Sequence, residues 1–139
     1  MKDENCIFCK ILAGEIPSYK VYEDDDFTVI LDVGPATRGH ALVIPKEHYK
    51  NLYELPDELA GKAFVLGKKM ITMLTEALGC DGYNLVQNNG AVAGQTVEHF
   101  HLHLIPRYKD DQAGLGWKMG SLDADEAAAI LDQIRKSQA

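Results

Sequence analysis

The fold of this chain is indicated most strongly by one stretch, His99-Phe100-His101-Leu102-His103-Leu104-Ile105. Histidines alternate there with apolar residues, and a two-residue period is typical of a β-strand with one buried face. We therefore expect the apolar side chains to face a core, with His101 and His103 pointing together to the other side. Alternating histidines of this kind serve as paired metal ligands in many sites, but they also occur as incidental polar residues on a hydrated face.

The segment that leads into this stretch is rich in glycine and uncharged polar residues. It contains Asn88-Asn89-Gly90 and Ala93-Gly94-Gln95-Thr96. Glycine lets a backbone approach a ligand closely, and asparagine, glutamine and threonine offer uncharged hydrogen bonds. The two segments together predict a cradle for phosphate oxygens with imidazoles beside it.

Working outward from there, we predict an α+β fold built on a five-stranded antiparallel sheet. A short N-terminal helix is expected over residues 5–14, with Asn5 as a possible N-cap and Gly14 as its stop. One long helix begins at Pro56-Asp57 and runs to Leu78, and a C-terminal helix runs from about 123 to 136. The strands are expected at 19–23, 27–31, 40–45, 83–87 and 101–105.

The long helix carries apolar residues at helical spacing, which predicts that one of its faces packs on the sheet. Repeats, low-complexity tracts and long linkers are absent from the sequence, so residues 1–139 are expected to form a single domain. The predicted core positions of the helix are Leu59, Ala63, Leu66, Met70, Met73, Leu74 and Ala77.

Composition narrows the class of protein. The 139 residues are 46% hydrophobic and 25% charged, with a net charge of −7. An acidic surface repels long polyanions, so a nucleic acid partner is not expected, although a pocket can still bind a small phosphate ester. No apolar run approaches the roughly 20 residues that cross a bilayer, so no membrane partner is expected. The N-terminus does not resemble a secretory signal, and we expect a cytoplasmic protein with reduced cysteines.

The pattern His-x-His-x-His-x-x with apolar x, formed here by residues 99–105, resembles the signature of the histidine triad (HIT) superfamily. The resemblance covers nearly the whole chain, and it implies a HIT-like fold and a homodimer. The chain has features of two branches of this superfamily, Hint and Fhit. The segments Ala93-Gly94-Gln95-Thr96-Val97 and Pro106-Arg107 are more similar to the Fhit branch than to the Hint branch. The matches to the Hint branch are Ile7-Phe8, Lys10-Ile11, Glu15-Ile16-Pro17, Glu23-Asp24-Asp25, Asp32, residues 40–46 and His48.

This resemblance implies a nucleotide hydrolase that acts at the α-phosphorus through a nucleotidyl-histidine intermediate. The Hint-like half favours purine nucleoside phosphoramidates or related nucleotide conjugates. The Fhit-like features favour dinucleoside polyphosphates, and Thr96 stands where Hint members usually have serine. Two other classes stay open: a nucleotide-binding regulatory module with weak turnover, and a metalloenzyme that uses the triad itself as ligands.

The resemblance also implies roles for individual residues. His101 is the expected nucleophile, with the backbone carbonyl of His99 fixing its tautomer, and a neutral imidazole is a competent nucleophile near pH 7. His103 and His40 are expected at the phosphate oxygens or the leaving group. Asp32 is the expected acceptor for the ribose hydroxyls. The expected oxyanion-stabilising set is Asn88, Gly94, Gln95 and Thr96, and the base pocket is expected from Ile7, Phe8, Ile11 and Ile30.

Cys6 and Cys9 form a Cys-x-x-Cys pair, which is typical either of a redox motif or of half a zinc site. The redox interpretation needs a thioredoxin-like βαβ context, which the sequence lacks. Resemblance to zinc-binding bacterial HIT proteins and galactose-1-phosphate uridylyltransferases implies one structural zinc ion per chain, held by Cys6, Cys9, His48 and His99. No catalytic metal is expected, and Cys80 is expected to be a free thiol.

The segment after the triad contains the only tryptophan of the chain, Trp117, between Gly116 and a polar stretch. A large amphipathic ring on a glycine-containing loop is typical of a lid or of a contact across a dimer interface. Packing of Trp117 onto its own domain is an equally good interpretation. The resemblance to HIT proteins, in which the C-terminal segment can reach the partner subunit's active site, slightly favours the lid or interface interpretation.

Overall fold

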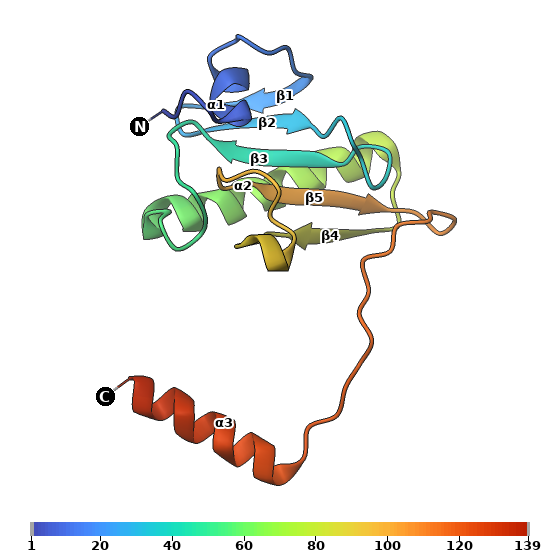
Figure 1. The fold of residues 1–139 in the computed structure, drawn as a ribbon. Coiled ribbons are helices and arrows are strands. Elements are labelled where there is room, and N and C mark those ends of the chain that lie inside the picture. Colours follow the sequence, from blue (N-terminus) through green and yellow to red (C-terminus); the bar gives the residue numbers. More distant parts are fainter. Residues whose placement is uncertain (1, 139) are drawn as a thin grey trace.

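The computed structural model describes residues 2–138, and within them it contains one antiparallel sheet, three α-helices and a short 3-10 helix (Figure 1). The α+β prediction is therefore confirmed. The elements in chain order are α1 (Ile7–Leu12), β1 (Lys20–Glu23), β2 (Phe27–Leu31), β3 (Ala41–Pro45), α2 (Asp57–Leu78), β4 (Gly82–Val86), η1 (Ala91–Ala93), β5 (Leu102–Arg107) and α3 (Ala124–Ser137).

The strand order in the sheet is β1-β2-β3-β5-β4, and every neighbouring pair is antiparallel. The last strand in sequence, β5, therefore lies between β3 and β4. Its His103 pairs with Leu42 of β3 on one side and with Val86 of β4 on the other. This insertion places the triad segment beside β3, with His103 opposite Leu42 and His99 near Pro45 at the end of that strand.

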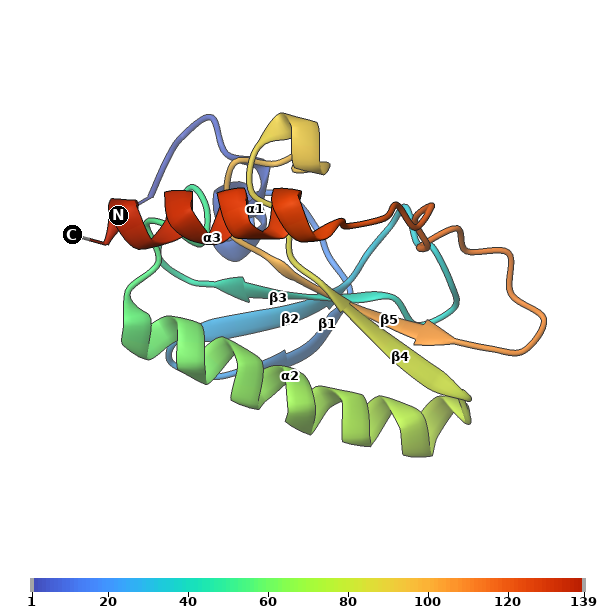
Figure 2. The same cartoon turned by 90° about the horizontal axis from the view of Figure 1, so that it is seen from below.

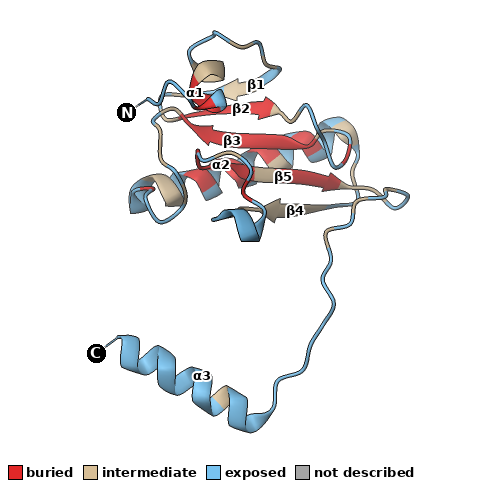
Figure 3. Cartoon of the chain, in the orientation of Figure 1, coloured by how far each residue is buried: buried red, intermediate tan, exposed pale blue. Residues whose placement is uncertain are grey.

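The sheet is covered on both faces, and the two faces have separate apolar cores. Figure 2 shows α2 along one face and α1 against the other, and Figure 3 shows that both inner surfaces are buried. Phe100, Leu102 and Leu104 are buried in the α2 core, as the alternating pattern predicts. The α1 core contains Cys6, Phe8 and Cys9 from α1 and its cap, packed against Ile30, Leu42 and Ile44.

Two predicted core positions of α2 are wrong. Met73 is 45% exposed and Ala77 is also exposed, whereas Ala63, Leu66, Met70 and Leu74 are buried. The buried stripe of α2 is narrower than the apolar stripe in the sequence, because the helix contacts the sheet along a single line and Met73 points away from it.

The ends of several elements also differ from prediction. The N-cap of α1 is Cys6 rather than Asn5: the Cys6 sulfur accepts the Cys9 N–H at 3.3 Å, while the Asn5 N–H donates to Asp3. The strand β5 begins at Leu102, so His101 lies just before it. The reason is that the Phe100 N–H donates to the Tyr49 carbonyl at 2.7 Å, which takes this residue out of the sheet ladder.

The C-terminal helix α3 lies apart from the sheet, beyond the β4 edge (Figure 1). The predicted cap is confirmed, because the Asp123 carboxylate accepts the Glu126 N–H at 2.8 Å. None of the residues of α3 is buried. The connection to it starts at a fixed point, where Arg107 binds Asp111 and the Asn84 side chain. Among residues 2–138, no helix has both the length and the apolarity that crossing a bilayer requires.

Candidate active site

His101 is held in one tautomer by the backbone. Its Nδ1 lies 2.8 Å from the His99 carbonyl oxygen, which can only accept a hydrogen bond, so Nδ1 carries the proton. The neutral ring therefore keeps a lone pair on Nε2. The side chain is 6% exposed and packs edge-on against Phe8, with ring centroids 5.0 Å apart. A buried imidazole with one bare, oriented nitrogen is chemically suited to attack an electrophile.

His103 lies beside His101, with ring centroids 4.9 Å apart, so the predicted pairing on one face is confirmed. Its Nδ1 is 2.9 Å from Nε2 of His40, which comes from the residue just before β3. His40 in turn accepts the Ala36 N–H on Nδ1 at 2.9 Å. Gly39, which precedes it, has φ +91°, and a Cβ there would collide with Leu78.

A pocket of about 250 Å³ opens in front of these rings, and His101 and His103 line it. All four residues predicted for a base pocket lie in its wall: Ile7 and Phe8, and Ile11 and Ile30. Apolar side chains from α1 and β2 therefore face each other across a slot that ends at the two imidazoles. Further lining residues, which were not predicted to form the pocket, are Ile16, Pro17, Ser18, Leu31, Val33, Leu42 and Val97.

Asp32 lies at the rim of the same pocket, directly after β2. Its Oδ1 accepts the Gly34 N–H at 2.8 Å, and its Oδ2 lies 3.5 Å from Nε2 of His40. Because Asp32 lines the pocket, its carboxylate can accept hydrogen bonds from a bound diol, as expected for ribose hydroxyls.

Most polar groups of the glycine-rich loop hold the loop itself together, and few of them face the pocket. Gly94 has φ +96°, and a Cβ on it would lie 3.3 Å from the Asn88 amide nitrogen, so these two residues are in close contact. The Gln95 side chain is 8% exposed and bonds the Gly90 N–H and the carbonyls of Lys50 and Val97. The N–H groups of Gly94 and Gln95 are bonded within the loop. Of the predicted phosphate-binding set, Thr96 is the residue that lines the pocket.

Behind this pocket, Cys6, Cys9, His48 and His99 converge, with their four candidate ligand atoms all within 4.8 Å of one another. Nδ1 of His99 lies 3.3 Å from the Cys6 sulfur, 3.5 Å from the Cys9 sulfur and 3.2 Å from Nδ1 of His48. Nδ1 of His48 lies 3.4 Å from the Cys9 sulfur. A tetrahedral zinc ion with bonds of about 2.0–2.1 Å to nitrogen and 2.3 Å to sulfur separates its ligand atoms by roughly 3.3–3.6 Å in nitrogen-containing pairs. The donor set therefore fits such an ion.

The protons in this group fit a metal as well. Nε2 of His99 lies 2.9 Å from the Pro45 carbonyl oxygen, so that nitrogen carries the proton and Nδ1 offers its lone pair to the group. A second cluster, Asp32, His40 and His103, is equally compact. There, however, His40 uses Nδ1 to accept an amide N–H, so its Nε2 is protonated and cannot ligate a metal. The tautomers thus separate a metal-type cluster from a hydrogen-bonded one.

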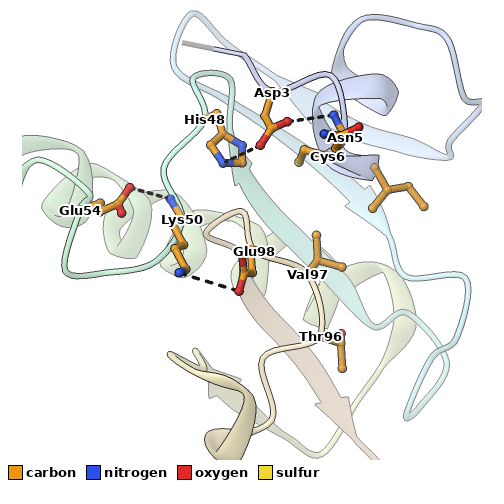
Figure 4. A pocket seen from close by; sticks show the side chains of 10 residues that line it. Asp3, Asn5, Cys6, His48, Lys50, Glu54, Thr96, Val97 and Glu98 are labelled. Atoms are coloured by element: carbon orange, nitrogen blue, oxygen red, sulfur yellow. Dashed lines mark hydrogen bonds and ion pairs between the residues drawn. The ribbon is translucent and has the colours of Figure 1, made fainter.

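The metal-type cluster borders a second, polar cavity of about 520 Å³ (Figure 4). Asp3, Cys6 and His48 lie together at one end of it, with the Asp3 carboxylate 4.0 Å from Nε2 of His48. Lys50 and Glu98 face each other at the other end. Ile7, Thr96 and Val97 line both this cavity and the apolar pocket, so one thin wall separates the two.

Burial favours the neutral form of the three histidines at and beside the pocket. It lowers the pKa of His103 to about 4, with the neighbouring His101 and His40 adding to the effect. Burial also lowers the pKa of His40 and His101, partly offset by the nearby Asp32 carboxylate. Burial also raises the pKa of the Cys6 thiol, and a bound cation would favour its thiolate form.

Comparison with known proteins identifies the family. The family profile described as "HIT domain" matches residues 13–110. The chain belongs to the HIT family.

One curated relative and two solved structures show how similar this HIT protein is to known members of the family. Adenosine 5'-monophosphoramidase HNT1 of Saccharomyces cerevisiae is 44% identical over 134 residues, which cover 95% of this chain and 82% of that protein. The crystal structure of SMU.412c from Streptococcus mutans gives a TM-score of 0.93 at 40% identity, covering 99% of this chain and 88% of that one. The crystal structure of a Zn-bound histidine triad family protein from Mycobacterium smegmatis gives a TM-score of 0.76 at 36% identity, covering 96% of this chain and 97% of that one.

Several groups that shape this HIT site have no signal in the sequence. The carbonyls of His99 and Pro45 and the N–H of Ala36 orient the histidines, but every residue has such backbone groups. Asp3 is a partial exception, because an acidic residue three positions before the first cysteine is a candidate partner for a ligand histidine.

The lowered pKa of His103 predicts a pH dependence of stability. Its pKa is about 4 when folded and about 6.5 when unfolded, so the unfolded chain binds more protons between these values. Its contribution to the free energy of unfolding is therefore complete above pH 6.5 and is lost as the pH falls toward 4. Because the ring is only half-buried, we expect the parent to lose on the order of 1 kcal/mol more than His103→Gln between pH 7 and pH 5. Urea unfolding at both pH values measures this, and equal losses would contradict it.

Proposed function

We propose that this HIT protein hydrolyses nucleotides at the α-phosphorus, acting on purine nucleoside phosphoramidates or related nucleotide conjugates through a nucleotidyl-His101 intermediate. The observation that carries the proposal is the bare Nε2 of His101, oriented by the His99 carbonyl at the end of an apolar slot. In this proposal the base lies between Phe8 and Ile30, and the ribose hydroxyls bind Asp32.

The two imidazoles that line the pocket would divide the work. Nε2 of His101 attacks the phosphorus, and the N–H groups around it bind the phosphoryl oxygens and stabilise their developing charge. In this proposal His103 and Thr96, which line the pocket, supply such donors, while Asn88, Gly94 and Gln95 support the loop that carries Thr96.

The reaction balances in two steps. A bond forms between His101 Nε2 and the α-phosphorus while the bond from phosphorus to the leaving amine breaks, and the amine takes its electron pair and one proton from solvent. Water then attacks the phosphorus, the bond to Nε2 breaks, and the water returns one proton to solvent. The products are a nucleoside monophosphate, the free amine and an unchanged imidazole.

The Hint-like and Fhit-like features of the sequence favour different leaving groups. The Saccharomyces cerevisiae relative is named as an adenosine 5'-monophosphoramidase, which supports a phosphoramidate. The Fhit-like Gly94-Gln95-Thr96 motif keeps a dinucleoside polyphosphate as the alternative substrate. A regulatory module with weak turnover would bind the same nucleotides without forming the covalent adduct.

We further propose that one structural zinc ion per chain is bound by Cys6, Cys9, His48 and His99. Support comes from the spacing and tautomers of these ligands and from the Zn-bound Mycobacterium smegmatis relative. When bound, the ion supplies a cross-link between α1, the loop after β3 and the segment before β5. Thiol ligands remain available in a reducing compartment, which supports a cytoplasmic location.

A homodimer is also proposed, because α3 has an apolar face that the rest of the chain leaves uncovered. Ile130, Leu131 and Ile134 lie on one side of the helix and are 38–49% exposed. Isolated helices of this length are marginal in water, so packing must stabilise α3. A second copy is the occupant that we propose, since the connection carries α3 past β4, one of the two edge strands of the sheet, where a partner can approach. Trp117 and Met119 on the connection are also exposed.

The nucleophile is tested with His101→Ala. We expect its turnover of adenosine phosphoramidate to fall by about three or more orders of magnitude with the fold retained, as for the loss of a covalent nucleophile. Assays alongside a dinucleoside polyphosphate and a sugar nucleotide rank the leaving groups, and mass spectrometry of acid-quenched parent enzyme detects the adduct. Activity of the variant within tenfold of the parent would remove His101 from the role.

The metal is tested by elemental analysis of protein purified without chelator, with Cys9→Ser compared against Cys80→Ser. The parent and Cys80→Ser are expected to contain one zinc per chain, because Cys80 lies outside the cluster. Cys9→Ser is expected to lose zinc and several degrees of melting temperature. Metal-free native protein, or equal zinc in the two variants, would exclude the site.

The dimer is tested with Ile130→Glu on the apolar face of α3, matched by Ala129→Glu on its opposite side. Light scattering should give twice the chain mass for the parent and for Ala129→Glu. The Ile130 variant should dissociate at least tenfold more readily, because it would bury a charge in the interface. A monomeric parent, or identical behaviour of the two variants, would refute the arrangement.

A further inference from the structure

The starting point is a backbone amide that donates to an imidazole. The Ala36 N–H lies 2.9 Å from Nδ1 of His40. A peptide N–H can only donate, so His40 must receive this hydrogen bond on the lone pair of Nδ1. A neutral His40 therefore carries its single ring proton on Nε2. The loop between β2 and β3 thus sets the tautomer of a histidine that is 5% exposed.

This proton has one close acceptor. Nε2 of His40 lies 2.9 Å from Nδ1 of His103, and the Asp32 carboxylate is more distant at 3.5 Å. When His40 donates to Nδ1 of His103, that nitrogen must use its lone pair, so His103 carries its own proton on Nε2. The Ala36 amide therefore sets the tautomer of His40 directly and the tautomer of His103 through His40.

The two rings differ in their access to substrate. His103 lines the apolar pocket together with His101, whereas His40 is not among the residues that form its wall. A substrate in the pocket can therefore reach His103 directly, and His40 acts on it through His103.

We propose that His40, held by the Ala36 amide, is a positioning residue that fixes His103 as the Nε2–H tautomer and so makes it a hydrogen-bond donor toward the phosphoryl group. The proposal rests on the proposed function, because it assigns a task within that reaction. It differs from the sequence-based expectation, in which His40 itself contacts the phosphate.

The consequence is a division of labour between neighbouring imidazoles. His101 has its proton on Nδ1 and presents a bare nitrogen, whereas His103 has its proton on Nε2 and presents an N–H. In the other tautomer, His103 would direct a lone pair at negatively charged phosphoryl oxygens, which would repel them. Burial favours the neutral form of both His40 and His103, with Asp32 opposing this shift at both rings, and only a neutral ring has a tautomer to select.

The proposal is tested without substrate by nitrogen-15 NMR of the imidazoles in the zinc-supplemented protein at neutral pH. We expect the Nε2–H pattern for His40 and His103 and the Nδ1–H pattern for His101. A His103 ring in the Nδ1–H form, or in a mixture of the two forms, would overturn the proposal. This measurement stands independently of whether a phosphoramidate is hydrolysed.

A matched pair of variants then connects the tautomer to turnover. In His40→Gln the amide nitrogen can still donate to His103, whereas His40→Leu removes the donor at similar volume. Thermal melting first establishes that both variants are folded. We then expect His103 to stay in the Nε2–H form in His40→Gln but not in His40→Leu. We also expect kcat of the Leu variant to be at least tenfold below that of the Gln variant, at the low end of what a positioned proton donor contributes. Equal kcat values for the two variants, or an unchanged His103 tautomer with Leu, would overturn the proposal.

Discussion

The chemistry of this protein depends on hydrogen bonds between backbone groups and imidazoles. The His99 carbonyl holds His101, the Pro45 carbonyl holds His99, and the Ala36 amide holds His40. A carbonyl forces a proton onto the nitrogen that it contacts, and an amide forces it away. Three chemically identical rings therefore offer different atoms to their surroundings, and the difference comes from the fold alone.

The sheet order explains why these backbone groups are within reach. Because β5 lies between β3 and β4, Leu42 of β3 and His103 of β5 are direct neighbours although more than fifty residues separate them. His40 and His103 meet across this pair, and His99 reaches the end of β3 at Pro45. The same insertion places the metal-type cluster next to the apolar pocket, with Ile7, Thr96 and Val97 as the shared wall.

Much of this arrangement could be predicted, because it follows from side-chain patterns. Alternation predicts Leu102 and Leu104 in the core, and the resemblance to zinc-binding HIT proteins implies the cluster of Cys6, Cys9, His48 and His99. The rest depends on tertiary contacts that leave no pattern. His101 falls outside β5 because Phe100 pairs with Tyr49. Gln95 offers a suitable amide in sequence, but the loop uses that amide to hold itself together. Cys6 caps α1 in place of Asn5, which joins a turn around Asp3.

His99 has two ends with separate duties. Its ring belongs to the cysteine–histidine cluster, and its carbonyl belongs to the orientation of His101. Every amino acid at position 99 has this carbonyl, whereas only histidine has the ring. A substitution therefore affects the two roles differently. Replacement of residue 99 can abolish a ligand, yet it leaves in the chain the acceptor that aligns the neighbouring imidazole. A relative without the cysteine–histidine cluster could therefore still hold Nδ1 of His101 in its protonated form, provided that packing alone kept the backbone between Tyr49 and β5 on its present course.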